Sequence, residues 1–170
     1  MVATVIINRW TGAGPSASAI TSINTRANAY DTHSTADTTN PVKIKYGVTQ
    51  YSYKVSTQLF ASTTPTGTID NIKWYTDGAL GFGTGITCQV KAVATYTQAT
   101  GTPGDTGVVM TGGADAETKT SAAPLSVTGS ITNPNTGAIG YFVDYQLVIA
   151  DTAGPDASAA ETFTFSYDET

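Results

Sequence analysis

The sequence predicts an all-β protein: one domain over residues 1–170, folded as an antiparallel β-sandwich (Ig-like or jelly-roll-like) with long loops rich in Gly, Pro and Thr. Three observations predict this class. Apolar and polar residues alternate with a period of two, turn-forming residues separate the alternating runs, and no run has the length and period of a helix. A chain of 170 residues buries roughly two-thirds of its unfolded surface, so no disulfide is needed.

The strands are expected where the alternation is clearest. The runs, in chain order, are residues 2–9, 20–25, 42–46, 51–60, 69–76, 86–97, 106–111, 125–131, 139–149 and 161–167. In the run 51–60 the apolar set Tyr51, Tyr53, Val55 and Leu59 alternates with the polar set Ser52, Lys54, Ser56 and Gln58, which predicts one inward face. In the run 139–149 the second face carries Phe142 and Val148 beside Asp144 and Gln146, which predicts a central strand covered in part on both sides.

Turn-forming residues fill the spaces between these runs. The connecting segments include "GAGPSAS", "TTPTG", "TDGALGFGTG" and "TNPNTG", in which Gly supplies positive φ and Pro fixes φ near its turn value. The Ala-rich stretches around Ala114–Ala116 and Ala157–Ala160 are too short for a helix and are expected as loops with at most one helical turn. Residues 98–124 are expected to form an extended surface loop with a short strand inside.

The last run, "AAETFTFSYDET", sets Phe163, Phe165 and Tyr167 on one side of an extended segment. We expect these three rings to fill the chain's own core, with residues 168–170 emerging into solvent. Exchange of this strand with a neighbouring subunit is the alternative, since the preceding linker is long enough to cross over.

Charge limits the classes of partner. Only 12% of the residues are charged, and 8 Lys+Arg against 13 Asp+Glu give a net charge of −5. Such a surface disfavours nucleic-acid phosphate and anionic lipid, and no segment has the length of a membrane span. The opening "MVATVIINRW" is too short and lacks the basic region of a signal peptide, so we expect synthesis and assembly in a cytoplasm.

The sequence contains residues of the types used in catalysis and metal binding, but they form no catalytic motif. His33, the one histidine, lies in a polar turn, and Cys88, the one cysteine, falls in phase with Ile86 and Val90, as a buried residue would. A zinc site needs three or four ligands, mostly Cys and His, and the chain has only these two residues, so a zinc site is excluded. The acidic candidates for calcium or for glycoside hydrolysis are Asp105, Asp115 with Glu117, Asp151 with Asp156, Asp144, and Asp168 with Glu169. None of them has the required spacing, and "GFGTG" at 81–85 lacks a nucleotide-loop pattern, so we expect no enzyme, no metal and no cofactor.

Two tryptophans remain. An exposed Trp10 or Trp74 is the platform that a carbohydrate-binding module needs, whereas Trp74 follows Ile72 at strand spacing and is expected in the core.

Six segments together resemble a family of small β-rich virion structural proteins of tailed bacteriophages. They are "NRWTGAGPSASAITSIN" (8–24), "NPVKI" (40–44), "TQYSYKVSTQLF" (49–60), "IDNIKWYTDG" (69–78), "TSAAPLSV" (120–127) and "AETFTFSYDET" (160–170). The likeness rests on their order and spacing over nearly the whole chain, and no segment carries a catalytic residue.

The resemblance implies a capsid decoration or cementing protein, bound in many copies to the capsid lattice of a virion. Its expected partners are the major capsid protein or other virion proteins, and a homo-oligomer, such as a trimer, is the expected assembly. The alternative functions are a tail- or neck-associated structural protein and a carbohydrate- or receptor-binding β-sandwich module.

Overall fold

The computed structural model describes residues 2–20, 26–33, 40–154 and 159–170, and within these ranges it confirms the all-β prediction. Its paired strands form antiparallel sheets, and its helix is a single 3-10 turn. The strands are β1 (Val5–Thr11), β2 (Ser16–Ile20), β3 (Gln50–Tyr51), β4 (Val55–Ala61), β5 (Thr68–Tyr75), β6 (Ile86–Val93), β7 (Gly101–Thr102), β8 (Thr106–Gly107), β9 (Ala114–Asp115), β10 (Leu125–Ser126), β11 (Ile131–Thr132), β12 (Gly137–Ile149) and β13 (Thr164–Glu169); the helical turn η1 is Ala116–Thr118.

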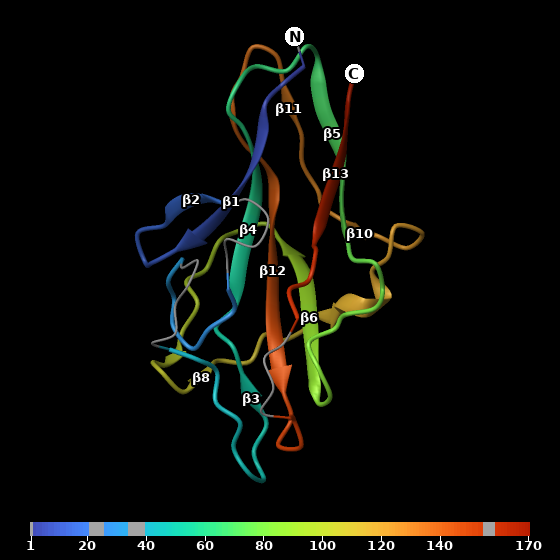
Figure 1. Ribbon diagram of the computed structural model, residues 1–170. Coiled ribbons are helices and arrows are strands. Elements are labelled where there is room, and N and C mark those ends of the chain that lie inside the picture. The colour runs from blue at the N-terminus through green and yellow to red at the C-terminus, as the bar shows by residue number, and fades with distance from the viewer. Residues whose placement is uncertain (1, 21–25, 34–39, 155–158) are drawn as a thin grey trace.

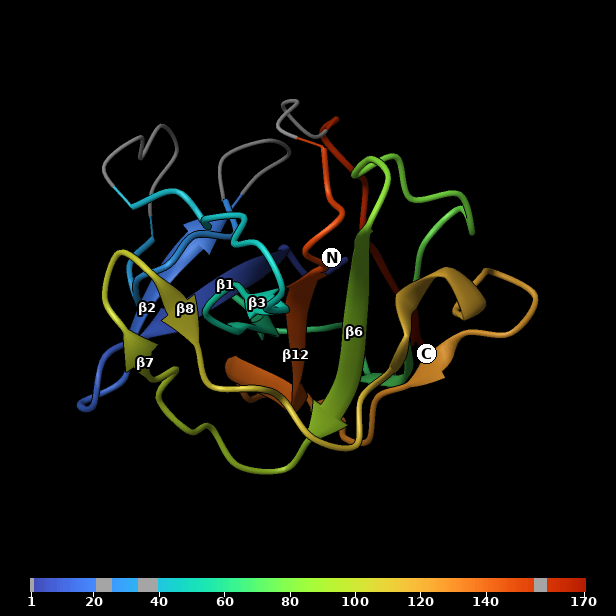
Figure 2. The same cartoon turned by 90° about the horizontal axis from the view of Figure 1, so that it is seen from below.

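The larger sheet has the strand order β2-β1-β4-β12-β6-β9. The long strand β12 is its centre, paired with β6 over eight residues from Phe142 to Ile149 and with β4 on the other side. The short strand β3 continues the line of β4 along β12, because Tyr51 pairs with Val148 while Val55 pairs with Tyr145. Figure 2 shows these strands from the end of the molecule that carries β3.

The smaller sheet is built around β5. On one side β13 runs antiparallel to it, and on the other side β10 and β11 pair with its two ends, at Trp74 and at Ile69. This sheet packs over one end of the larger sheet, where the start of β1 and the end of β13 also lie (Figure 1).

The core lies between the two sheets, as the alternation predicts. It takes Val55 and Leu59 from β4 and Val143 from β12, and faces Ile72 and Trp74 from β5. Trp74 is fully buried, with its ring centroid 4.9 Å from that of Phe163. Cys88 is also buried here, and this burial raises the pKa of its thiol to about 12, so the thiol is an unreactive core group.

The polar set of the run 51–60 corrects the prediction of one inward face. Ser52, Ser56 and Gln58 are buried although they alternate with the core residues. Because β4 lies inside the sheet and its second face is also covered, these side chains form hydrogen bonds there instead of meeting solvent. The Ser56 hydroxyl donates to Asp144 Oδ1 at 2.6 Å, and Gln58 Nε2 donates to the Gly140 carbonyl at 2.6 Å.

Several strand boundaries also differ from the prediction. Residues 42–46 form no strand, only an isolated bridge between Lys45 and Val48, and the run 106–111 is a strand only at residues 106–107. The run 86–97 ends as a strand at Val93, because the chain then leaves the sheet. The segment 98–124 holds three short strands and the helical turn η1, and residues 21–25 of the predicted strand 20–25 lie outside the described residues.

The final strand fills the core of its own chain. β13 pairs with β5, and Phe163, Phe165 and Tyr167 pack against the buried cluster. Asp168 and Thr170 are exposed, as expected, but the end of the chain is not a free tail: the strand continues through Glu169, and Thr170 exchanges backbone hydrogen bonds with Thr68. The Glu169 carboxylate accepts from the Thr66 amide at 2.7 Å and from the Ala3 amide at 3.1 Å, so it fastens the start of the chain to its end.

Glu169→Gln is expected to lower the melting temperature at neutral pH. The Thr66 amide, followed by the Ala3 amide, lowers the pKa of Glu169 below its ordinary 4.5, so the ionised form is favoured in the folded state. A lowered folded-state pKa contributes stability above pH 4.5 and loses it as the pH falls through the folded value. Melting curves from pH 7 to pH 3 should therefore converge for wild type and variant; Glu117→Gln, at an exposed position, is the control and should match wild type throughout.

Candidate functional site

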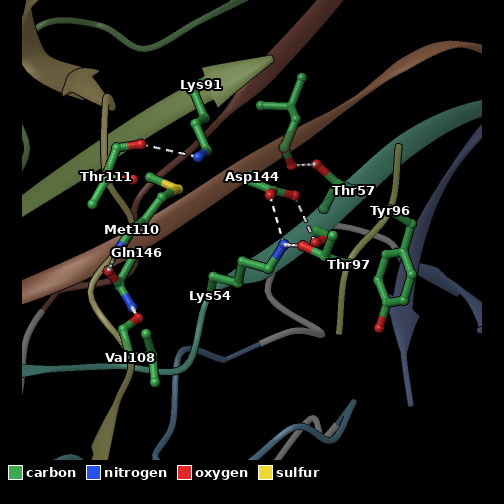
Figure 3. Close-up of polar contacts among 12 residues, drawn as sticks. Lys54, Thr57, Lys91, Tyr96, Thr97, Val108, Met110, Thr111, Asp144 and Gln146 are labelled. Carbon is green, nitrogen blue, oxygen red and sulfur yellow. Dashed lines mark hydrogen bonds and ion pairs between the residues drawn. The ribbon is translucent and has the colours of Figure 1, made fainter. Parts of the chain in front are cut away.

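Two parts of the segment 94–111, at Thr97 and at Val108–Met110, lie over the face of the larger sheet that carries Asp144 and Gln146 (Figure 3). Gln146 is fully buried on β12. Its Oε1 accepts from the Met110 amide at 2.7 Å, and its Nε2 donates to the carbonyls of Ser52, at 2.7 Å, and Val108, at 2.9 Å. One side chain thus joins the loop to the sheet and to the residues between β3 and β4.

Asp144 is the centre of a polar cluster beside this clamp. Its buried carboxylate accepts from Lys54 Nζ at 2.8 Å and from Ser56 Oγ at 2.6 Å. Lys54 Nζ also donates to Thr97 Oγ1 at 2.8 Å, so the ion pair ties the loop to β12 (Figure 3). The sequence predicted that the face carrying Asp144 is covered in part, and the structure buries Asp144 there. An Asp held by two donors is a structural acid rather than a free general base.

Aromatic rings close one side of the cluster. Phe142 lies between Trp10, at a centroid distance of 5.8 Å, and Tyr96, at 5.9 Å. Lys54 Nζ lies 5.9 Å from the centre of the Tyr96 ring. Burial, and secondarily the charge of Asp31, raises the pKa of Tyr96 to about 12, so this phenol stays neutral. Trp10 is thereby packed against its own chain on one edge.

A groove of about 340 Å³ runs between the loop and the sheet. Its walls carry Lys54, Lys91, Asp144, several threonines and the segment 108–111. Lys91 Nζ donates to the Thr111 carbonyl at 3.0 Å. The wall of the groove therefore carries threonine hydroxyls and the ammonium of Lys91, which forms no ion pair with a carboxylate of the described residues. These groups can form weak hydrogen bonds with a polar surface.

Lys54→Met is expected to destabilise the fold by about 2 kcal/mol. The substitution leaves the Asp144 carboxylate buried without its cation. Breaking a fully buried ion pair costs about 3–5 kcal/mol. The loss here is smaller because water in the adjoining groove can solvate the carboxylate. Urea unfolding measures the change. Lys91→Met is the matched control from the same groove, because Lys91 bonds only a carbonyl in a partly exposed position; equal losses for the two variants would contradict this account.

A second surface feature lies in the half of the molecule opposite the start of β1 and the end of β13 (Figure 1). Among the described residues eight large apolar side chains are exposed, and six of them lie in the loops 28–33, 41–49 and 100–111. The six are Tyr30, Ile44, Tyr46, Val48, Val108 and Val109. We call these three loops the apolar loop end.

Hydrogen bonds join the three loops into one unit. The Ala29 amide donates to the Asn40 carbonyl at 2.9 Å, the Gly104 amide donates to the Ala29 carbonyl at 2.8 Å, and Lys45 Nζ lies 2.6 Å from Asp105 Oδ1. The apolar loop end is therefore held as a surface, although its residues come from separate parts of the sequence.

Among the described residues, the structure does not bring the predicted candidates together in one cluster. His33, which the sequence places in a polar turn, is half-buried; burial, followed by the charge of Arg9, lowers its pKa. Asp105 pairs with Lys45, and Asp115 accepts the Glu117 amide to start η1. Asp168 accepts from Asn71 Nδ2 at 2.6 Å, while Glu169 binds backbone amides elsewhere.

The acidic residues predicted as calcium candidates do not gather into a metal-binding cluster within the described ranges. No group of three or more His, Cys, Asp or Glu residues there is placed to hold a metal ion; Asp156, one of the predicted pair with Asp151, lies outside those ranges. No helix in the described part of the chain is long and apolar enough to cross a membrane.

Comparisons with protein-family models, curated proteins and solved structures found no match to this chain.

Proposed function

We propose that this chain is a structural protein of a tailed-bacteriophage particle, most simply a capsid decoration protein bound in many copies to the capsid lattice. The observation that carries the proposal is the apolar loop end: six exposed apolar side chains on three loops fixed to one another. Apolar side chains left exposed on loops that are bonded to one another are consistent with a docking surface. The resemblance of six sequence segments to virion proteins supplies the class of partner.

The architecture suits a protein that acts by binding. A doubly covered sheet gives a rigid body, and the loops at one end present the contact residues. If each copy spans a junction between capsid subunits, its buried contact area is lost when the subunits separate, so binding stabilises the closed lattice. Many weak contacts on one particle then act together.

The alternative is a carbohydrate- or receptor-binding module on a tail or neck. The residue that would bind the sugar in such a module is neither of the two tryptophans that the sequence suggested. Trp74 is buried in the core and Trp10 packs on Phe142, so neither indole is a free platform. The exposed aromatic ring that would serve a sugar is Tyr46 in the apolar loop end.

Purified particles of the encoding phage test the proposal. Quantitative mass spectrometry should find this chain in a fixed, high ratio to the main shell protein, and particles without it should lose their contents at a lower temperature. Absence of the chain from purified particles would rule out a virion role, and a ratio of a few copies per particle would favour the tail or neck.

A further inference from the structure

We propose that Tyr46 is the anchor by which this chain docks on its protein partner, entering an apolar socket edged by carboxylates. The inference rests on the proposed function and names the contact through which it acts. Tyr46 is 99% exposed, the largest exposure among the large apolar residues of the described chain, and it stands at the tip of the loop 41–49.

The local turn presents the ring outward. The Val48 amide donates to the Lys45 carbonyl at 3.3 Å, which closes a turn over Tyr46 and Gly47. Gly47 has φ +70°, the left-handed value that a type II turn requires at its third position. Tyr46 therefore occupies the second position of the turn, and the exposed Ile44 and Val48 flank it.

The tip is fixed before any partner binds. Lys45 pairs with Asp105 at 2.6 Å, and at the base of the loop the Tyr51 amide donates to Thr106 Oγ1 at 3.1 Å. A tyrosine has only two side-chain torsions to order, so a tyrosine on a fixed turn loses little entropy on burial. Tyrosine is also among the residues that contribute most to binding at interfaces.

Charge indicates the rim of the socket. The segment "PVKIKYGVT" at 41–49 contains two lysines and no acidic residue, in a chain of net charge −5. Lys45 is paired with Asp105, whereas Lys43 is exposed beside Ile44. A partner surface with carboxylates around an apolar pocket complements this local charge.

Two other occupants fit less well. An anionic membrane would repel a chain of charge −5, and three apolar side chains on one turn bury far less area than an amphipathic helix. A second copy docking tip to tip would bring the lysines of both copies together. A folded protein partner is therefore the occupant that the loop favours.

Capsids purified from a phage lacking this gene provide the binding probe. Wild-type protein is expected to bind saturably in co-sedimentation, and Tyr46→Ser at least about tenfold more weakly, since a central interface tyrosine is worth that much. Lys43→Glu should weaken binding and reduce its dependence on salt. Tyr141→Ser and Val2→Ser, which remove exposed apolar residues away from the apolar loop end, should bind as wild type.

The outcomes separate the two proposals. If wild-type protein does not bind the capsids, the proposed function fails and the inference fails with it. If wild type binds and Tyr46→Ser binds equally, with an unchanged melting temperature, only the inference is overturned. Binding to phosphatidylcholine–phosphatidylserine vesicles, or Tyr46-dependent self-association in sedimentation, would also overturn it.

Discussion

Gly129→Ala is expected to destabilise the protein by about 4 kcal/mol or more, a large part of the roughly 5–15 kcal/mol that holds a typical domain folded. Gly129 lies in the connection between β10 and β11, at the point where this connection passes close to Gly140 of β12. A Cβ at Gly129 would lie 2.0 Å from the Gly140 Cα, so the two backbones would have to separate. Separation would break the hydrogen bond, 2.7 Å long, from the Tyr141 amide to the Thr128 carbonyl.

Gly137→Ala is the matched control. Gly137 has φ +131°, close to the +137° of Gly129, but a Cβ at Gly137 meets no atom within 4 Å. It carries only the backbone strain of an alanine at positive φ, about 1–3 kcal/mol. Urea unfolding should rank the variants wild type, Gly137→Ala and Gly129→Ala in falling stability; equal losses at both glycines would show that the close approach at β12 is relaxed in solution.

The crossing at Gly129 shows which part of the fold a sequence pattern predicts. Alternation located the strands around Val55, Val143 and Phe165, because burial on one face repeats every second residue. Alternation gave no signal for the contact between Gly129 and Gly140, since that contact depends on how the connection from β10 to β11 passes β12 in space. The run 125–131 that contains Gly129 was predicted as one strand, whereas only Leu125–Ser126 and Ile131–Thr132 are strands.

Polar residues of the sheet were misjudged for a related reason. Ser56 and Gln58 match the pattern of a solvent face, and nothing local to them shows that this face is covered. Their partners are far along the chain: 88 residues separate Ser56 from Asp144. The one available signal was the apolar pair Phe142 and Val148 on the same face, which did predict partial cover.

The proposed docking surface was not predicted from the sequence, because catalytic and metal-binding motifs give no indication of exposed apolar residues. Tyr46 lies in the run 42–46, whose alternation of apolar residues and lysines predicts a strand. The following Gly47 was the usable signal, because a glycine after an exposed aromatic favours a turn tip. The joining of this tip to the loops at Ala29 and Asp105 needed the structure.

Gln146→Leu is expected to destabilise the protein by about 3–5 kcal/mol. Leucine has nearly the same size, but it leaves the Met110 amide and the carbonyls of Ser52 and Val108 without their side-chain partner, at about 1–3 kcal/mol for each group that stays buried. The loss should be local before it is global. Hydrogen exchange at the Met110 amide should quicken by more than at the amides of β5, which lie in the other sheet.

Gln89→Leu provides the matched control, because Gln89 is the cross-strand neighbour of Gln146 on β6. Its buried Oε1 has no hydrogen-bond partner, so the same substitution removes an unsatisfied acceptor and should leave stability unchanged or raise it slightly. A loss at Gln89 as large as that at Gln146 would mean that leucine disturbs packing on this face wherever it is placed. A loss confined to Gln146 would instead make the three hydrogen bonds the cause, and would show that the loop bearing Val108 and Val109 is positioned by this one side chain.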